Sequence, residues 1–192
     1  MLMNVLIFVL TFVFGVEGLC FYPCRRQELG KYIKLNDPGR NRVSQFNCKH
    51  PTLVVSPETG ETRECFALNG PFIVQRLQGQ RLMFRCLKDM TIDPSSQIVV
   101  LYAKPFRTYS KTPTLCEVCG APDRWLLSML AAQGVSRQRA LRVKAPPIGC
   151  NVPKDCQIKN PYTDLPCNGC EPKEDDGLCC RGCKIPRNQH YA

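Results

Sequence analysis

The position of the cysteines constrains this chain more than any other sequence feature. All fourteen cysteines lie at or after Cys20, and none lies in the apolar N-terminal segment. Residues 1–18 contain a nearly uninterrupted apolar run and end in Val16-Glu17-Gly18, a small-residue pattern that signal peptidase accepts. The run is shorter than the roughly 20 apolar residues of a membrane span. We therefore expect a signal peptide at residues 1–18, followed by a secreted, extracellular protein without a transmembrane segment.

The cysteines divide into two even sets at Cys150. Eight lie up to and including Cys150, and six follow it. Each half can therefore close its own disulfides, although the sequence does not fix their connectivity. We predict that no disulfide crosses this boundary and that all fourteen cysteines form disulfides: Cys20, Cys24, Cys48, Cys65, Cys86, Cys116, Cys119, Cys150, Cys156, Cys167, Cys170, Cys179, Cys180 and Cys183.

Charge supports the same boundary. Residues 19–150 contain 20 Lys and Arg against 9 Asp and Glu, whereas residues 151–192 contain 6 of each. The second segment also has too few apolar residues to bury a core, so disulfides must hold it together. We expect a β-rich disulfide domain at 19–150 and a disulfide-stapled, cysteine-rich, knottin-like C-terminal tail at 151–192.

Short apolar runs separated by turn residues predict antiparallel strands in the larger domain. The predicted strands cover residues 31–35, 52–55, 64–68, 72–77, 81–87 and 97–102. Strands at this spacing favour an antiparallel sandwich or a small barrel over βαβ units.

A change of periodicity near residues 122–143 predicts a small helical segment. Pro122 suits the first turn of a helix, and that helix places Trp125 on its apolar face. Ser136 suits the N-cap of a second helix that ends near Val143. We therefore expect a mainly β protein with two short helices, and we expect Trp125 to be buried against the sheet.

Several short motifs resemble an uncharacterised group of secreted, cysteine-bearing, lipocalin-like β domains of invertebrate animals. The motifs are Cys20-Phe21-Tyr22-Pro23, Leu29-Gly30-Lys31-Tyr32, Phe84-Arg85-Cys86-Leu87 and Leu115-Cys116-Glu117-Val118-Cys119, followed by a helix and Cys150. The Gly-x-Tyr at Tyr32 is also similar to the Gly-x-Trp of lipocalins, in which the aromatic ring plugs the barrel floor. The resemblance covers about residues 20–150. It implies secretion and a lipocalin-like barrel, and it implies no activity.

Three Cys-x-x-Cys pairs are the candidate metal ligands: Cys116/Cys119, Cys167/Cys170 and Cys180/Cys183. Two such pairs can form a zinc site with four thiolates. Outside the cell, however, cysteines oxidise to disulfides. The acidic run at residues 174–176 does not have the spacing of an EF-hand calcium loop. We therefore predict no metal and no cofactor.

Catalytic residues are scarce in this chain. The two histidines are His50, in an expected loop, and His190, near the C-terminus. No Gly-x-Ser-x-Gly or His-Glu-x-x-His motif is present. A hydrolase would need His50 to meet a serine, cysteine or carboxylate in a pocket. We therefore predict that the protein is not an enzyme.

Clustered arginines are the remaining functional signal. Three lie within the second expected helix and three flank an expected hairpin; the six candidate binding residues are Arg76, Arg81, Arg85, Arg137, Arg139 and Arg142. We expect them to point outward and form one patch for an anionic extracellular partner, which is a polysaccharide, a lipid headgroup or an acidic protein. The predicted extracellular location excludes nucleic acid as the partner.

These observations predict a non-catalytic extracellular binding or matrix protein with a basic surface. Three alternatives remain open. One is a lipocalin-like carrier of a small apolar ligand, which requires a cavity inside the sheet. The second is a secreted effector, either a toxin or a protease inhibitor, that acts through the cysteine-rich tail. The third is a hydrolase, which requires the pocket at His50.

Overall fold

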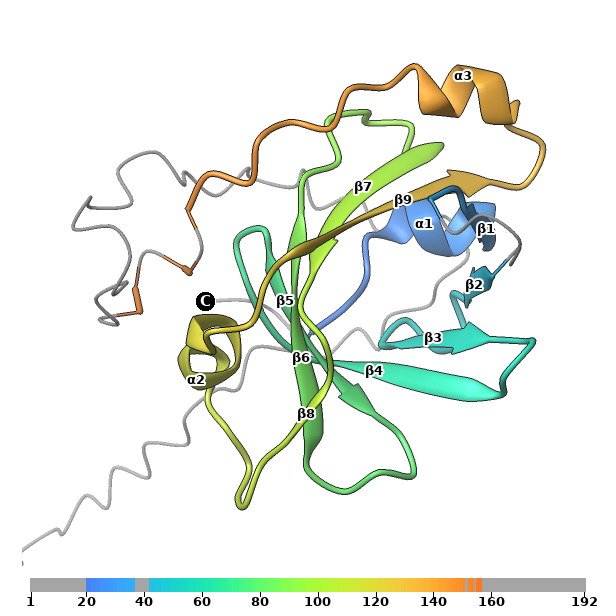
Figure 1. Ribbon diagram of the computed structural model, residues 1–192. Coiled ribbons are helices and arrows are strands. Elements are labelled where there is room, and N and C mark those ends of the chain that lie inside the picture. The colour runs from blue at the N-terminus through green and yellow to red at the C-terminus, as the bar shows by residue number, and fades with distance from the viewer. Residues whose placement is uncertain (1–19, 37–41, 151, 154, 157–192) are drawn as a thin grey trace, which may run out of the picture.

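The computed structural model describes residues 20–36, 42–150, 152–153 and 155–156 (Figure 1). The expected signal peptide and most of the expected cysteine-rich tail lie outside the described residues. Helices and strands are named below by the labels of Figure 1.

The chain forms a closed antiparallel barrel of eight strands. The strands are β1 (Lys31–Lys34), β2 (Val43–Phe46), β3 (Leu53–Ser56), β4 (Glu61–Asn69), β5 (Phe72–Leu77), β6 (Met83–Asp89), β7 (Ile98–Ala103) and β9 (Leu126–Ala132). From β1 to β7 each strand pairs with the next; β9 then pairs with both β7 and β1 and so closes the ring. The short strand β8 (Arg107–Thr108) pairs with β6. Of the two predicted sheet architectures, the small lipocalin-like barrel is confirmed.

Alternation along the strands decides which side chains enter the barrel. On β5, Ile73 belongs to the inner apolar cluster, whereas its neighbours Phe72 and Val74 belong to an outer cluster. Successive side chains of a strand point to opposite faces, so a strand that is covered on both sides buries consecutive residues. The turns between the strands need residues with positive φ, and Gly60 and Gly79 supply them at φ 67° and 77°.

One end of the barrel is closed by aromatic side chains and by helix α1 (Cys24–Leu29). Tyr32 on β1 is fully buried, and its hydroxyl donates to the carbonyl oxygen of Ser96 at 2.9 Å. Its ring meets Phe46 edge to face, with the ring centroids 5.4 Å apart. From α1, Arg26 reaches Asp89 at the end of β6, with 2.5 Å between Nη2 and Oδ2. The buried charge of Arg26 is therefore neutralised at this closed end.

Two short helices cover apolar patches on the outside of the barrel. Helix α2 (Leu115–Gly120) lies against β5 and β6, where Val118 packs with Phe72 and Phe84. Helix α3 (Arg137–Leu141) buries Ala140 against the outer face of β7 and β9. The predicted second helix is therefore confirmed in position, although the Ser136 side chain makes no capping hydrogen bond.

The predicted helix beginning at Pro122 is wrong, because residues 126–132 form strand β9. Leu, Met and Ala favour helices in isolation, and a seven-residue apolar run does not distinguish a helix from a buried strand. Tertiary pairing decides the outcome, since without β9 the adjacent edges of β1 and β7 would be unpaired. Trp125 precedes the strand and is only partly buried, with its ring centroid 6.5 Å from that of Phe72.

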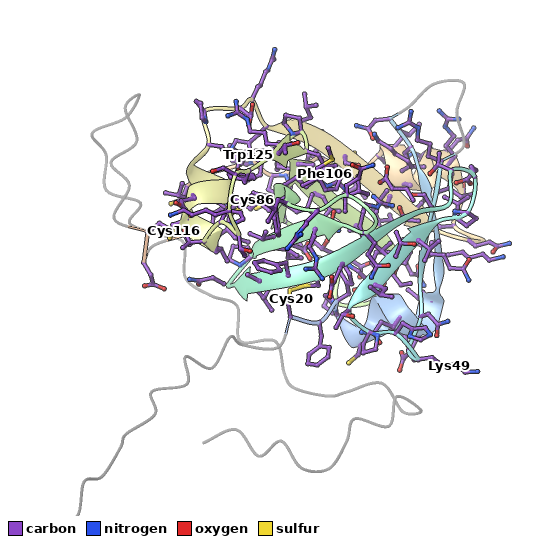
Figure 2. The ribbon with its side chains drawn as sticks, turned by 90° about the horizontal axis from the view of Figure 1, so that it is seen from below. Cys20, Lys49, Cys86, Phe106, Cys116 and Trp125 are labelled. Atoms are coloured by element: carbon purple, nitrogen blue, oxygen red, sulfur yellow. A yellow bond between two sulfur atoms is a disulfide. The ribbon has the colours of Figure 1, made fainter. Side chains whose placement is uncertain are left out.

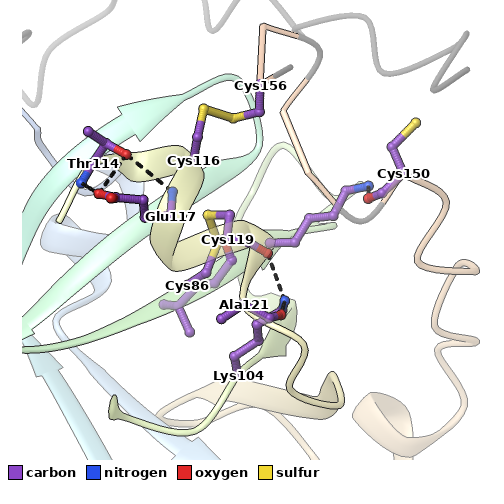
Figure 3. The surroundings of a disulfide bond; sticks show 11 residues. Cys86, Lys104, Thr114, Cys116, Glu117, Cys119, Ala121, Cys150 and Cys156 are labelled. Atoms are coloured by element: carbon purple, nitrogen blue, oxygen red, sulfur yellow. Dashed lines mark hydrogen bonds between the residues drawn. A yellow bond between two sulfur atoms is a disulfide. The ribbon is translucent and has the colours of Figure 1, made fainter. Parts of the chain in front are cut away.

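Three disulfides join described cysteines: Cys20–Cys65, Cys86–Cys119 and Cys116–Cys156. The third contradicts the prediction that no disulfide crosses the boundary at Cys150 (Figure 3). Cys116 and Cys119 lie on one helix, and each bonds a different partner instead of the other. Cys119 faces the barrel wall at β6, whereas Cys116 bonds the chain segment that returns over α2 (Figure 3).

Cys24 and Cys48 are not bonded to another described cysteine, and five of the fourteen cysteines predicted to form disulfides lie outside the described residues. Cys24 begins α1 and Cys48 follows β2, and both are partly exposed. A disulfide requires a second sulfur at bonding distance. The other described cysteines are already bonded, so none of them is available to either thiol.

Two lysines fasten the outer segments to the barrel. Lys104 donates to the carbonyl oxygens of Cys119, at 2.7 Å, and of Ala121, at the end of α2 (Figure 3). Burial lowers the pKa of Lys104 to about 8. Lys88 donates to the carbonyl oxygens of Ile148 and Cys150 at 2.5 and 2.7 Å. The two ammonium groups bind backbone carbonyls at a helix end and in a loop. The role of both lysines is therefore structural.

Candidate functional site

The barrel contains a cavity of about 390 Å³. Its lining extends to Arg42 before β2, to Glu58 and Thr59 in the β3–β4 turn and to Leu126 at the start of β9. In an antiparallel barrel these positions meet at one end, opposite the end that Tyr32 and α1 close. The volume lies within the roughly 300–1,000 Å³ of sites for small molecules. The cavity is therefore the candidate functional site.

Apolar side chains form the inner part of the cavity. They project inward from six strands and are Phe46, Val54, Ile73, Leu87, Leu101 and Leu130. Leu101 on β7 and Leu130 on β9 are 8% and 5% exposed. Burial of apolar ligand surface against such a wall is favourable by roughly 25 cal/mol per Å².

Arg63 on β4 brings a guanidinium into this interior. Its Nη2 donates to the hydroxyls of Ser56, at 2.6 Å, and Ser44, at 3.5 Å. Its Nε lies 3.2 Å from Glu61 Oε1, which is ion-pair distance, but the two are not aligned as a hydrogen bond. Burial lowers the pKa of Arg63, and the Glu61 carboxylate opposes that shift. Arg63 therefore has one carboxylate neighbour, and that neighbour is 39% exposed.

Arg85 on β6 also points inward, beside Gln75 on β5. Its Nε donates to Gln75 Oε1 at 2.8 Å, and its Cζ lies 4.4 Å from the centre of the Phe106 ring. Gln75 in turn donates to the hydroxyl of Tyr22. Figure 2 shows Phe106 among the side chains of the barrel and Lys49 at its periphery. Among the described residues, no carboxylate lies within ion-pair distance of Arg85.

No neighbour of Arg85 forms an ion pair with it, and the Glu61 carboxylate acts on its charge only from beyond ion-pair distance. Burial lowers the pKa of the Arg85 guanidinium, and the nearby charge of Arg63 lowers it further. Burial raises the pKa of Tyr22 to about 12, so this phenol is uncharged at neutral pH. Gln75 is neutral as well. The site therefore combines an apolar wall with a partly buried cation whose hydrogen-bonded and stacked neighbours are neutral.

The predicted arginine patch is wrong as a single surface. Alternation on β6 turns Arg85 into the cavity, whereas Arg76 on β5 faces outward and donates to Glu64 at 2.9 Å. Arg81 is exposed in the β5–β6 turn. Arg137, Arg139 and Arg142 are exposed on or directly after α3, which lies at the opposite end of the barrel from that turn (Figure 1).

Sequence reasoning missed Tyr22, Arg63 and Gln75 as site residues. The available signal was alternation, because Arg63 and Cys65 share one face of β4, and Cys65 joins the inner cluster. A charged residue two positions from a buried cysteine was therefore a candidate for the interior.

His50 is exposed between β2 and β3 and does not line the cavity. Within the described ranges, no group of three or more His, Cys, Asp or Glu side chains is placed to bind a metal ion. No helix in the described part of the chain has the length and apolarity to cross a membrane.

No protein-family model matches this chain, and neither curated proteins nor solved structures include a match. The resemblance to secreted lipocalin-like domains therefore stays a prediction.

Proposed function

We propose that this protein is a secreted, non-catalytic carrier that binds a small, largely apolar ligand inside its barrel. The observation that carries the proposal is the cavity of about 390 Å³ with an apolar wall and one open end. A preformed cavity of this kind binds a ligand without the cost of ordering a loop or a domain.

The barrel is well suited to hold this cavity open. Closure leaves no strand edge to adjust, and Cys20–Cys65 joins the N-terminal segment to β4. Tyr32 closes the far end, so a ligand enters past the β3–β4 turn. The three disulfides are also compatible with an oxidising, extracellular environment.

Filling the cavity should abolish ligand binding. Ala103 at the end of β7 lines the cavity, and an indole ring at this position would occupy space that the ligand needs. We expect Ala103→Trp to weaken the binding of decan-1-ol, an uncharged apolar probe, by about tenfold or more, measured by isothermal titration calorimetry.

Leu68→Trp is the matched control, because Leu68 on β4 is 46% exposed and does not line the cavity. This variant should bind decan-1-ol like the wild type. If the wild type binds neither decan-1-ol nor any other apolar probe of this size, with or without a charged head group, the carrier function is wrong.

A second candidate function is the binding of an anionic partner by α3. Arg137, Arg139 and Arg142 are all exposed there, and the nearby Lys144 is exposed as well. Exposed charges of one sign attract an opposite charge over roughly 8 Å at physiological ionic strength.

Retention on heparin tests this second function. We expect replacement of Arg137, Arg139 and Arg142 by glutamine to lower the salt concentration that elutes the protein. A control that replaces Arg25, Arg81 and Arg124 removes the same charge from other exposed positions. If the eluting salt concentration falls equally in both variants, the effect is one of net charge only, and α3 is rejected as a binding surface.

A further inference from the structure

The charge around the cavity is unbalanced. Six lining side chains are cationic and two are carboxylates, so neutralisation within the lining is incomplete. The cations are Arg26, Lys34, Arg42, Arg63, Arg85 and Lys104, and the carboxylates are Glu58 and Glu61. Asp89 neutralises Arg26 at the closed end, and Lys104 binds the carbonyl oxygens at the end of α2. Arg63 is within ion-pair distance of Glu61. Arg85 also points inward, and the contacts that the described fold gives it, Gln75 and the Phe106 ring, are neutral.

The contacts of Arg85 fix the guanidinium without neutralising it. Gln75 binds Nε, and the ring of Phe106 lies against the guanidinium. Gln75 is itself held by Tyr22, which lies within the barrel beside Phe46. None of the described hydrogen bonds uses the two terminal nitrogens of Arg85. Those nitrogens remain as a preoriented pair of donors for a ligand.

A planar carboxylate matches such a pair of donors. Two parallel N–H···O bonds to one carboxylate add both strength and geometric specificity. One carboxylate also supplies the single negative charge that Arg85 lacks. The apolar wall begins next to the Arg85 guanidinium, because Leu87 is two residues from Arg85 on the same face of β6.

We infer that the ligand of this cavity is a small amphipathic carboxylate, whose head group pairs with Arg85 while its apolar part lies against Leu87, Leu101 and Leu130. This inference rests on the proposed carrier function and adds the chemical class of the ligand. The aromatic ring of Phe106 shields the ion pair from water on one side, which strengthens the attraction.

A matched pair of probes tests the head group. Decanoate and decan-1-ol have the same chain length and differ in charge at the head. We expect wild-type protein at neutral pH to bind decanoate roughly 10- to 100-fold more tightly than decan-1-ol, as charge-assisted hydrogen bonds provide. Isothermal titration calorimetry measures both affinities in the same buffer.

Substitution of Arg85 tests the assignment to this residue. Arg85→Gln should remove the preference for decanoate and leave decan-1-ol binding within about threefold of wild type, because the apolar wall is retained. Arg85→Lys should keep part of the preference, since it keeps the charge and loses the planar fork. Arg76→Gln is the matched control: the same substitution on the neighbouring strand, at an outward arginine, should change neither affinity.

The outcomes separate the two proposals. Equal binding of both probes by the wild type would overturn the carboxylate inference and leave the carrier function standing. Binding of neither probe would overturn the carrier function. A preference for decanoate that survives in Arg85→Gln would assign the head group to another cation. If Arg85→Gln also fails to bind decan-1-ol, the variant has not kept its fold. In that case the affinities of Arg85→Lys for decanoate and for decan-1-ol decide whether Arg85 binds the head group.

Discussion

Tyr32→Ala should destabilise the folded protein by about 3–5 kcal/mol, as loss of other buried aromatic rings does. Tyr32 is fully buried and packs against Phe46 at the closed end of the barrel. Removing the ring leaves a cavity between β1 and β2 and leaves the Ser96 carbonyl oxygen without this donor. Urea unfolding followed by circular dichroism measures the free energy of unfolding.

Tyr32→Phe separates the ring from its hydroxyl. This variant keeps the packing and removes only the hydrogen bond to Ser96, so we expect a cost of about 1 kcal/mol. If Tyr32→Ala and Tyr32→Phe have similar stabilities, packing of the ring is not what stabilises this end of the barrel.

Removing the Cys116–Cys156 disulfide should have a comparably large effect. The bond closes a sequence separation of 40 residues, for which restriction of the unfolded chain gives about 4 kcal/mol. We expect the double variant Cys116→Ala, Cys156→Ala to unfold at a correspondingly lower urea concentration than the wild type.

The matched control is the double variant Cys24→Ala, Cys48→Ala. It also removes two sulfur atoms, but these cysteines form no cross-link in the described structure, so its stability should change much less. Peptide mapping without reduction provides an independent measurement. A peptide that joins Cys116 to Cys119, or an equal loss of stability in both double variants, would contradict the assigned connectivity.

Much of the barrel was predictable from local patterns. The sequence runs at β5, β6 and β7 alternate or are densely apolar, and a turn that contains Gly79 separates β5 from β6. The sequence therefore predicted the ends of these three strands to within two residues. The short strand β2 was missed, because Val43–Phe46 contains two polar residues among four. Strand β9 was mistaken for a helix, since its residues have high helix propensity.

The candidate site was less predictable than the fold. Arg85 was named from the sequence, but as a member of an outer basic patch. Alternation shows that Arg85 and Leu87 share a face of β6, yet it does not show which face becomes the interior. Both faces of β6 carry apolar side chains, because Leu87 lies in the inner cluster while Phe84 and Cys86 pack with α2. Only the closed barrel therefore decides that Arg85 points inward, beside Gln75.

The sequence by itself determined a disulfide-rich antiparallel β protein, because alternation, turn residues and cysteine number are local properties of the chain. The tertiary structure decided three further matters: closure of the barrel, the inward direction of Arg63 and Arg85, and the partners of the cysteines. Closure joins β1 to β9 through pairs such as Lys34 with Leu130, which local patterns do not encode. Contacts between residues so distant along the chain form only when the whole sheet curls and closes. The charged cavity exists only in that closed barrel.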